Sequence, residues 1–216
     1  MLSKQQTQQA VAIMGEMFPD AQPSLDARTP FQYMISVMLS AQATDISVNK
    51  VTPKLFTDFP DPQTMAAASE TTLQLAIHSI GLYRNKAKHM KAASQALLTD
   101  FNGVVPHTRA ELMQLPGVGR KTADVVLADA FGIPAFAVDT HVTRVTKRLH
   151  MVPQNATVLE IEQKMMKQLP EDQWVTAHHQ MIYFGRYQCL ARAPKCAQCP
   201  LLELCADGQH RLGLKK

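Results

Sequence analysis

Hydrophobic residues along this chain recur mostly at the spacing of an α-helix, and few Val, Ile or Thr runs alternate at period two. Apolar residues that follow Pro30 lie at i, i+3, i+4, i+7 and i+8, which is one face of a helix: Phe31, Met34, Ile35, Met38 and Leu39. Proline is favoured in the first turn of a helix because its missing N–H has no partner there anyway. The pattern therefore predicts a helix that begins at Pro30.

Capping and stop signals predict further helices. Thr108 and Glu111 have the spacing of a capping box, and Pro116 with Gly117 then stops a helix over Arg109 to Leu115. The same rules predict helices over Arg120 to Ala130, after Asp139, over Val158 to Leu169, and around Trp174 to Tyr183. We predict an all-α protein with an internal boundary near Gly132-Ile133-Pro134.

Length and composition support a protein with a well-buried core, because 46% of the 216 residues are hydrophobic. The first residues lack the apolar stretch of a signal peptide, and no apolar run approaches the roughly 18 residues that cross a bilayer. We expect a soluble, cytoplasmic protein without membrane contact. Residues 134–216 hold 11 Lys and Arg against 7 Asp and Glu, whereas residues 1–133 hold 11 of each. This excess fits either DNA binding or a solvated basic face.

All four cysteines, Cys189, Cys196, Cys199 and Cys205, fall within 17 residues near the C-terminus. A disulfide scaffold spreads its cysteines through a short secreted chain, so this tight group indicates a metal site instead. Four thiolates suit either tetrahedral Zn²⁺ or a [4Fe–4S] cluster. Structural zinc more often uses two C-x-x-C pairs, and this chain has one, so the spacing favours the cluster.

A glycine-containing turn, Leu-Pro-Gly-Val-Gly-Arg-Lys over residues 115–121, lies between two predicted helices. Gly117 and Gly119 permit a tight turn, and the helix that begins at Arg120 offers unpaired N–H groups to an anion such as phosphate. Lys121 lies in the first turn of that helix, where the helix dipole disfavours an ammonium and favours a nucleophilic amine. An ordinary helix corner with a solvated or phosphate-binding lysine remains the alternative.

Asp139 ends a short apolar segment and precedes an apolar periodic run. By local rules it is a helix N-cap. A carboxylate at that place could also take a proton from an amine and stabilise positive charge on a sugar. We interpret His141, His178 and His179 as structural histidines.

Residues 115–121, the Val-Asp-Thr-His segment at 138–141 and the C-x6-C-x2-C-x5-C pattern together resemble the endonuclease III family of DNA glycosylases. The resemblance extends to Leu-Ser-Ala-Gln-Ala-Thr-Asp at 39–45, Gly-Leu-Tyr at 81–83 and Phe-Gly-Arg-Tyr at 184–187. It implies a helix-hairpin-helix fold with a six-helix barrel domain over residues 23–133. Residues 1–22 and 134–216 would form an iron–sulfur cluster domain, with a DNA groove between the two domains.

The resemblance also implies roles for single residues. Lys121 would be the nucleophile and Asp139 the catalytic carboxylate, while Gln42 and Leu82 would enter the space left by an extruded base. Gly117, Gly119, Arg120 and Lys195 would bind DNA, as would Arg192, and the cysteines would hold a [4Fe–4S] cluster. Asp124 departs from the asparagine that we expect in close relatives.

The implied function is a bifunctional DNA glycosylase and AP lyase of base excision repair, which excises oxidised pyrimidines from duplex DNA and nicks abasic sites by β-elimination. We expect a monomer that associates with the nucleoid in a bacterium. One rival is an adenine-mismatch glycosylase, which lacks this lysine, has glutamate where this chain has Ser36, and carries an additional C-terminal domain. Another is a non-enzymatic DNA- or metal-binding module.

Overall fold

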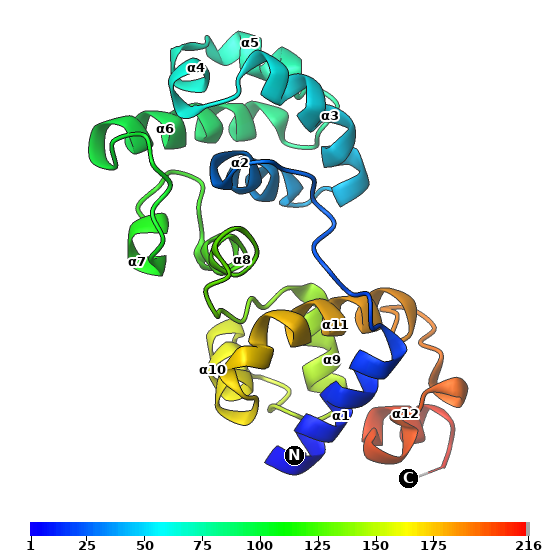
Figure 1. Cartoon of the computed structure of the whole chain (residues 1–216). Helices are drawn as coiled ribbons and strands as arrows, with labels where there is room; N and C mark the ends of the chain where they lie inside the picture. Colours follow the sequence, from blue (N-terminus) through cyan, green and yellow to red (C-terminus); the bar gives the residue numbers. More distant parts are fainter. Residues whose placement is uncertain (215–216) are drawn as a thin grey trace. The chain divides into compact units, whose positions relative to one another are not determined.

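The computed structural model describes residues 1–214 of the chain, and these contain α-helices and short 3-10 turns but no β-strand. The all-α prediction is therefore confirmed. The chain divides into two compact units, one formed by Met1–Pro23 together with the chain from Pro134 onward, and one formed by Ser24–Ile133. Figure 1 shows the helices of both units along the chain.

The structure describes every residue of the Ser24–Ile133 unit, which contains seven α-helices. They are α2 (Pro30–Ser40), α3 (Asp45–Asp58), α4 (Pro62–Ala67), α5 (Glu70–Ala76), α6 (Tyr83–Asp100), α7 (Arg109–Leu112) and α8 (Arg120–Phe131). Helix α2 packs against α3, α6 and α8, and α4 and α5 pack on α6. The predicted helix after Thr108 ends earlier than expected, because the chain turns at Met113, whose N–H still bonds to the Arg109 carbonyl.

Helix α2 is the core element of this unit, since every residue from Phe31 to Leu39 is buried. A helix that is buried on all sides lies within a core rather than on its surface. The hydroxyl of Tyr33 donates a hydrogen bond of 2.6 Å to Asp129 of α8. Burial, and secondarily the Asp129 charge, raises the pKa of Tyr33 far above its ordinary value, so the phenol remains a donor. This bond fixes α2 against the helix that carries Lys121.

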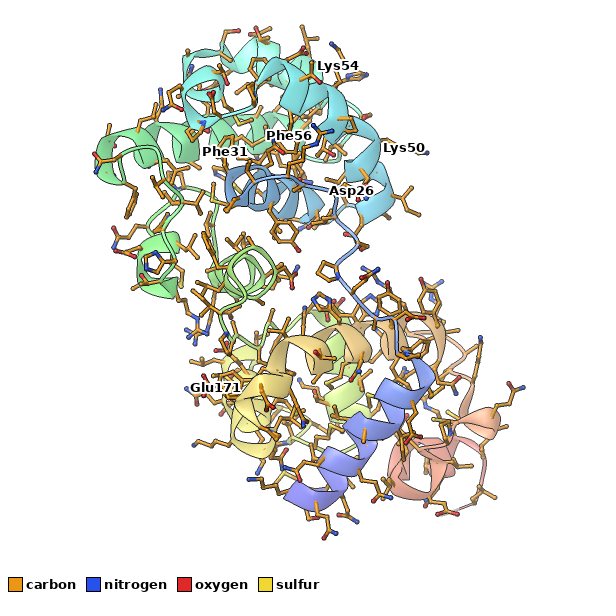
Figure 2. All side chains as sticks on the ribbon, viewed as in Figure 1. Asp26, Phe31, Lys50, Lys54, Phe56 and Glu171 are labelled. Carbon is orange, nitrogen blue, oxygen red and sulfur yellow. The ribbon has the colours of Figure 1, made fainter. Side chains whose placement is uncertain are left out.

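The lysines of α3 lie on the surface of the same unit, and a phenylalanine of α2 lies in its core. Lys50 and Lys54 of α3 are exposed and point away from the unit, whereas Phe31 lies inside it (Figure 2). Lys54 also forms an ion pair of 3.0 Å with Asp58, one turn further along α3. Such exposed pairs contribute little to stability.

The other unit contains α1 (Lys4–Met17), α9 (Thr140–Arg148), α10 (Val158–Gln168), α11 (Trp174–Tyr187) and α12 (Ala206–Arg211), with 3-10 turns at Glu171–Gln173, Cys196–Gln198 and Leu202–Leu204. Helix α11 packs against α1 and α9. The core includes Phe136, Met165 and Phe184. Backbone pairing between Leu2 and His150 attaches the N-terminus to the end of α9. No helix within the described residues is long and apolar enough to span a bilayer.

Candidate active site and cysteine site

The turn before α8 is built around Gly117. Its φ of 82° lies in the left-handed region, which favours glycine. A Cβ at this position would lie 2.7 Å from the Cβ of His89, so the turn also lacks room for a side chain. Gly119 differs, because it is the N-cap of α8 with an extended backbone that any residue adopts, and a Cβ there would meet nothing within 4 Å. The open space at Gly119 leaves the start of α8 accessible to an anion.

Lys121 is the second residue of α8 and its side chain is exposed. The first turn of α8 holds Arg120 and Lys121 and no acidic residue. The N–H groups of a first helical turn have no intrahelical partner and attract negative charge. An exposed amine thus lies beside a backbone site that favours an anion.

Asp124, the residue that departs from the expected asparagine, is buried at 1% exposure. Its carboxylate accepts a hydrogen bond of 2.5 Å from Nε of Arg109, and the two residues form an ion pair. Arg109 belongs to α7 and Asp124 to α8, so this pair joins the two helices that flank the turn. The charge of Asp124 is therefore faced by a guanidinium.

Asp139 caps α9, because its Oδ1 accepts a hydrogen bond of 2.8 Å from the Val142 N–H. The capping interpretation is thus confirmed. The buried, non-helical segment 135–138 precedes Asp139, which is half-buried. Lys121 and Asp139 belong to different units.

His141 follows Asp139 on α9 and is half-buried, with its Nδ1 at 3.1 Å from Nη2 of Arg144. Burial lowers the pKa of His141; the Asp139 carboxylate opposes this effect, and the charges of Arg144 and Arg186 add to it. His178 and His179 are buried, with ring centroids 5.0 Å apart. These surroundings are those of structural histidines.

Gln42 and Leu82 lie on two adjacent loops of the Ser24–Ile133 unit. Both have left-handed backbones, with φ of 55° and 60°, and both side chains are exposed. The Gln42 carbonyl lies 3.9 Å from the place of a Cβ on Gly81. Residues other than glycine rarely adopt this conformation, and such strain is concentrated at functional sites. The structure thus brings these two loops together.

The four cysteines line a single cavity of the other unit, together with residues of α9, α11 and α12. Donors approach two of the sulfurs: the Gly208 N–H lies 3.3 Å from Sγ of Cys205, and Nη1 of Arg148 lies 3.4 Å from Sγ of Cys189. Burial raises the pKa of the thiols of Cys196, Cys199 and Cys205. Four thiols around one cavity, with N–H donors near two of them, fit a multi-metal cluster whose positive charge would favour the thiolates. Among residues 1–214, no three His, Cys, Asp or Glu side chains converge as they would around a single ion.

Two arginines of α9 hold the segment that follows Cys189. Arg148 donates to the carbonyls of Leu190 and Ala191 at 2.7 and 2.9 Å, and its Nε lies 3.8 Å from Asp207. Arg144, one turn earlier, donates to the Cys189 carbonyl at 3.0 Å. The segment between the first two cysteines is therefore attached to α9 by side-chain bonds.

Arg192 and Lys195 are exposed on this same segment. The Lys195 N–H donates to the Gln188 carbonyl, and the Gln188 side chain donates back to the Lys195 carbonyl at 2.8 Å. These bonds close the loop at its base. The two cations are thus displayed from a loop whose backbone is well supported.

Sequence reasoning missed Lys86, Arg148 and the partner of Asp124. The burial of Lys86 could have been predicted from its spacing. It precedes Met90 by four residues, Ala93 by seven and Leu97 by eleven, which places it on the apolar face of its helix. A lysine in an apolar stripe indicates a buried charge with a specific role. Arg148 has no comparable signal, since basic residues are ordinary in the last turn of a helix.

Comparisons with known proteins identify the family of this chain. Residues 35–171 match the family described as HhH-GPD superfamily base excision DNA repair protein. Endonuclease III of Bacillus subtilis (strain 168) is 48% identical over 211 residues, which cover 98% of this chain and 96% of that protein. Endonuclease III of Escherichia coli (strain K12) is 44% identical over 192 residues, which cover 89% of this chain and 90% of that protein. The chain belongs to the endonuclease III family.

Solved structures also resemble this chain. A trapped endonuclease III–DNA covalent intermediate superposes with a TM-score of 0.96 at 50% identity, covering 98% of this chain and 100% of that one. A thermostable thymine-DNA glycosylase reaches a TM-score of 0.85 at 23% identity, which shows a shared fold alone. The predicted helix-hairpin-helix glycosylase fold is confirmed, and so is the prediction of a DNA glycosylase and AP lyase of base excision repair.

Proposed function

We propose that this chain excises oxidised, ring-saturated pyrimidines from duplex DNA, with Lys121 as the nucleophile and Asp139 as the catalytic carboxylate. The observation that carries the proposal is the position of Lys121. Its exposed amine lies in the first turn of α8, directly after the Gly117 turn and the open N-cap at Gly119. Gly117, Gly119 and Arg120 would bind the phosphate, which brings the sugar to the amine.

A single amine, that of Lys121, would serve both base removal and strand cleavage. The neutral Lys121 amine attacks C1′, the bond from C1′ to the base breaks, and the base leaves with the bonding electrons. Asp139 takes the proton of the attacking amine and stabilises the positive charge on the sugar. The resulting imine with the opened sugar acidifies the C2′ proton. Loss of that proton expels the 3′ phosphate, so the strand is nicked by β-elimination.

Gln42 and Leu82 would fill the space that the extruded base leaves. A base stacked in a duplex hides its glycosidic carbon, and extrusion costs a few kcal/mol, less at a damaged pair. Two exposed side chains on adjacent loops with left-handed backbones support this role, because such strained conformations cluster at functional sites.

The cavity lined by Cys189, Cys196, Cys199 and Cys205 would hold a [4Fe–4S] cluster, as the single C-x-x-C pair and the family both favour. The cluster would act as a structural cross-link that needs no redox chemistry. Its loop would present Arg192 and Lys195 to phosphates. Residues 1–22 and 134–216 would thus form a cluster domain, and residues 23–133 a six-helix barrel domain, with DNA bound in a groove between them.

Duplex DNA that contains oxidised pyrimidines or abasic sites would be the partner. Similar solved structures of endonuclease III in complex with DNA support DNA binding by this chain. We expect the chain to act as a monomer on chromosomal DNA, and thus in the cytoplasm at the nucleoid.

Borohydride trapping tests the proposal. Reduction during turnover on a thymine glycol duplex converts the hydrolysable imine into a stable amine, so protein and DNA become covalently linked. Lys121→Gln should lose both the adduct and nicking but still bind the damaged duplex. Lys54→Gln, which removes an exposed lysine of α3 instead, should trap normally. An adduct on the Lys121→Gln protein would identify another amine as the nucleophile and overturn the proposal.

A further inference from the structure

Lys86 of α6 is a charged side chain inside the Ser24–Ile133 unit, at only 7% exposure. Its Nζ donates a hydrogen bond of 2.8 Å to the carbonyl of Leu39, and no carboxylate among the described residues forms an ion pair with it. Burial lowers the pKa of the Lys86 ammonium. Burying a charged or polar group is costly unless it is well bonded, so the place of this lysine calls for a specific reason.

The bond from Lys86 to the Leu39 carbonyl lies at the C-terminal end of helix α2. Leu39 lies in the last turn of α2, where carbonyls have no partner within the helix, and the chain there turns away through a bond from Ala43 to Ser40 instead. A cation at a helix C-terminus is also stabilised by the helix dipole. Lys86 therefore fixes the point at which α2 gives way to the loop that carries Gln42.

The same lysine lies in the first turn of the helix that follows the second loop. The Lys86 N–H bonds to the Leu82 carbonyl at 3.1 Å, at the start of α6. Leu39 is three residues before Gln42, and Lys86 is four residues after Leu82. The side-chain bond of Lys86 thus joins the first turn of α6, which follows Leu82, to the last turn of α2, which precedes Gln42, and the two loops meet at Gly81.

We propose that Lys86 is a positioning residue for base extrusion, which holds the Gln42 and Leu82 loops in register so that both side chains can enter the duplex together. This inference rests on the proposed function. Lys86 takes no part in the covalent chemistry, since its amine is buried against the Leu39 carbonyl. Its removal therefore affects substrates whose base must be extruded from a duplex and spares those that have no opposing base.

The test compares duplex and single-stranded substrates. Lys86→Met keeps the length of the side chain and removes its charged donor. We expect single-turnover base release from a thymine glycol duplex to fall about tenfold or more, as loss of a charge-assisted bond implies. Imine trapping on a single-stranded abasic oligonucleotide should stay within about twofold of the wild type. A 2-aminopurine placed opposite the lesion should show a smaller fluorescence change on binding.

Lys91 provides a matched control. It lies on the same helix, and its Nζ also donates to a main-chain carbonyl, that of Ala68, at the end of α4 and outside the two loops. Lys91→Met should leave the ratio of duplex to single-strand activity unchanged. Lys86→Arg retains a cationic donor and should recover much of the wild-type ratio of duplex to single-strand activity. This variant also provides a readout if Lys86→Met folds poorly.

Three results would overturn the inference: an unchanged duplex rate in Lys86→Met, an equal loss on single-stranded DNA, or the same loss in Lys91→Met. Combination with Leu82→Ala adds a further check, because residues that act together are not additive. Lys86→Met should cost less in the Leu82→Ala background than in the wild type. Failure of the proposed function is distinguishable, since the Lys121→Gln protein would then still form an adduct or the wild-type protein would release no base from the thymine glycol duplex.

Discussion

Arg109 and Asp124 form an ion pair across the turn that precedes the candidate nucleophile. The Asp124 carboxylate is buried, whereas the Arg109 side chain is 30% exposed. The pair joins α7 to α8, and α8 begins one residue before Lys121. Where we expected asparagine in close relatives, this chain has a carboxylate with a guanidinium facing it. The charge of Asp124 is thus balanced at least in part by Arg109.

Removal of Arg109 should destabilise the protein, because it takes a positive partner from a buried carboxylate. We expect Arg109→Met to lower the free energy of unfolding by about 1–3 kcal/mol. Urea unfolding measures this change. Lys54→Met, which breaks the exposed pair with Asp58, is the matched control and should cost under about 1 kcal/mol. Equal losses in the two variants would show that the Arg109 pair is as weak as a surface pair.

Local signals in the sequence predicted α2 and α7 to α11, but they did not delimit α1, α3 to α6 or α12. The start at Pro30, the cap at Thr108 and the stop at Gly132 are each decided by residues within one turn of the boundary. The helix after Thr108 was predicted too long, since periodicity continues to Leu115 although the backbone turns at Met113. Local pattern does not determine where a short helix yields to a turn.

Only those residues of the candidate site that lie together in short sequence motifs could be predicted. The Gly117 turn, Lys121 and the four cysteines each lie in a short segment that can be read directly. The bond from Lys86 to Leu39 and the pair of Arg109 with Asp124 join residues that are 47 and 15 positions apart. Such contacts depend on how helices pack, which no local rule describes.

His141 should make stability depend on pH. Because burial is the largest influence and lowers its pKa below 6.5 in the folded state, the unfolded chain binds the proton more readily. Stability from this residue is complete above about pH 6.5 and is lost as the pH falls below that value. The free energy of unfolding at about pH 7.5 and pH 5 should therefore differ less in His141→Gln than in the wild type. An equal difference would exclude His141 as a source.

Arg148 should help to retain the proposed cluster, because it bonds to Cys189 and to the two carbonyls that follow it. The purified wild-type protein should contain about four irons per chain. Arg148→Met should lose visible absorbance faster in the presence of an iron chelator. Arg211→Met removes an exposed partner of Asp207 on α12 and should lose it at nearly the wild-type rate. Stoichiometric zinc in the wild-type protein would contradict the cluster itself.

Lys195 should contribute to the salt dependence of DNA binding. Each phosphate contact releases counterions and adds about −0.9 to the slope of log K against log salt concentration. Lys195→Ala should reduce the steepness of that slope by about one contact and leave lesion preference unchanged. Lys167→Ala on α10 provides a comparison with another exposed lysine of the same unit. If the slope of Lys195→Ala equals that of the wild type, Lys195 does not contact phosphate.

Asp139 allows its capping and catalytic roles to be separated. Its Oδ1 accepts the Val142 N–H, and asparagine caps a helix as well as aspartate does. Asp139→Asn should therefore keep nearly the wild-type melting temperature and bind damaged DNA comparably, while base release slows by about 10² to 10⁴ if the carboxylate is the general base. Asp139→Ala should lose the cap as well and about 1 kcal/mol of stability. If Asp139→Asn releases the base at the wild-type rate, Asp139 serves α9 alone and another group must accept the proton.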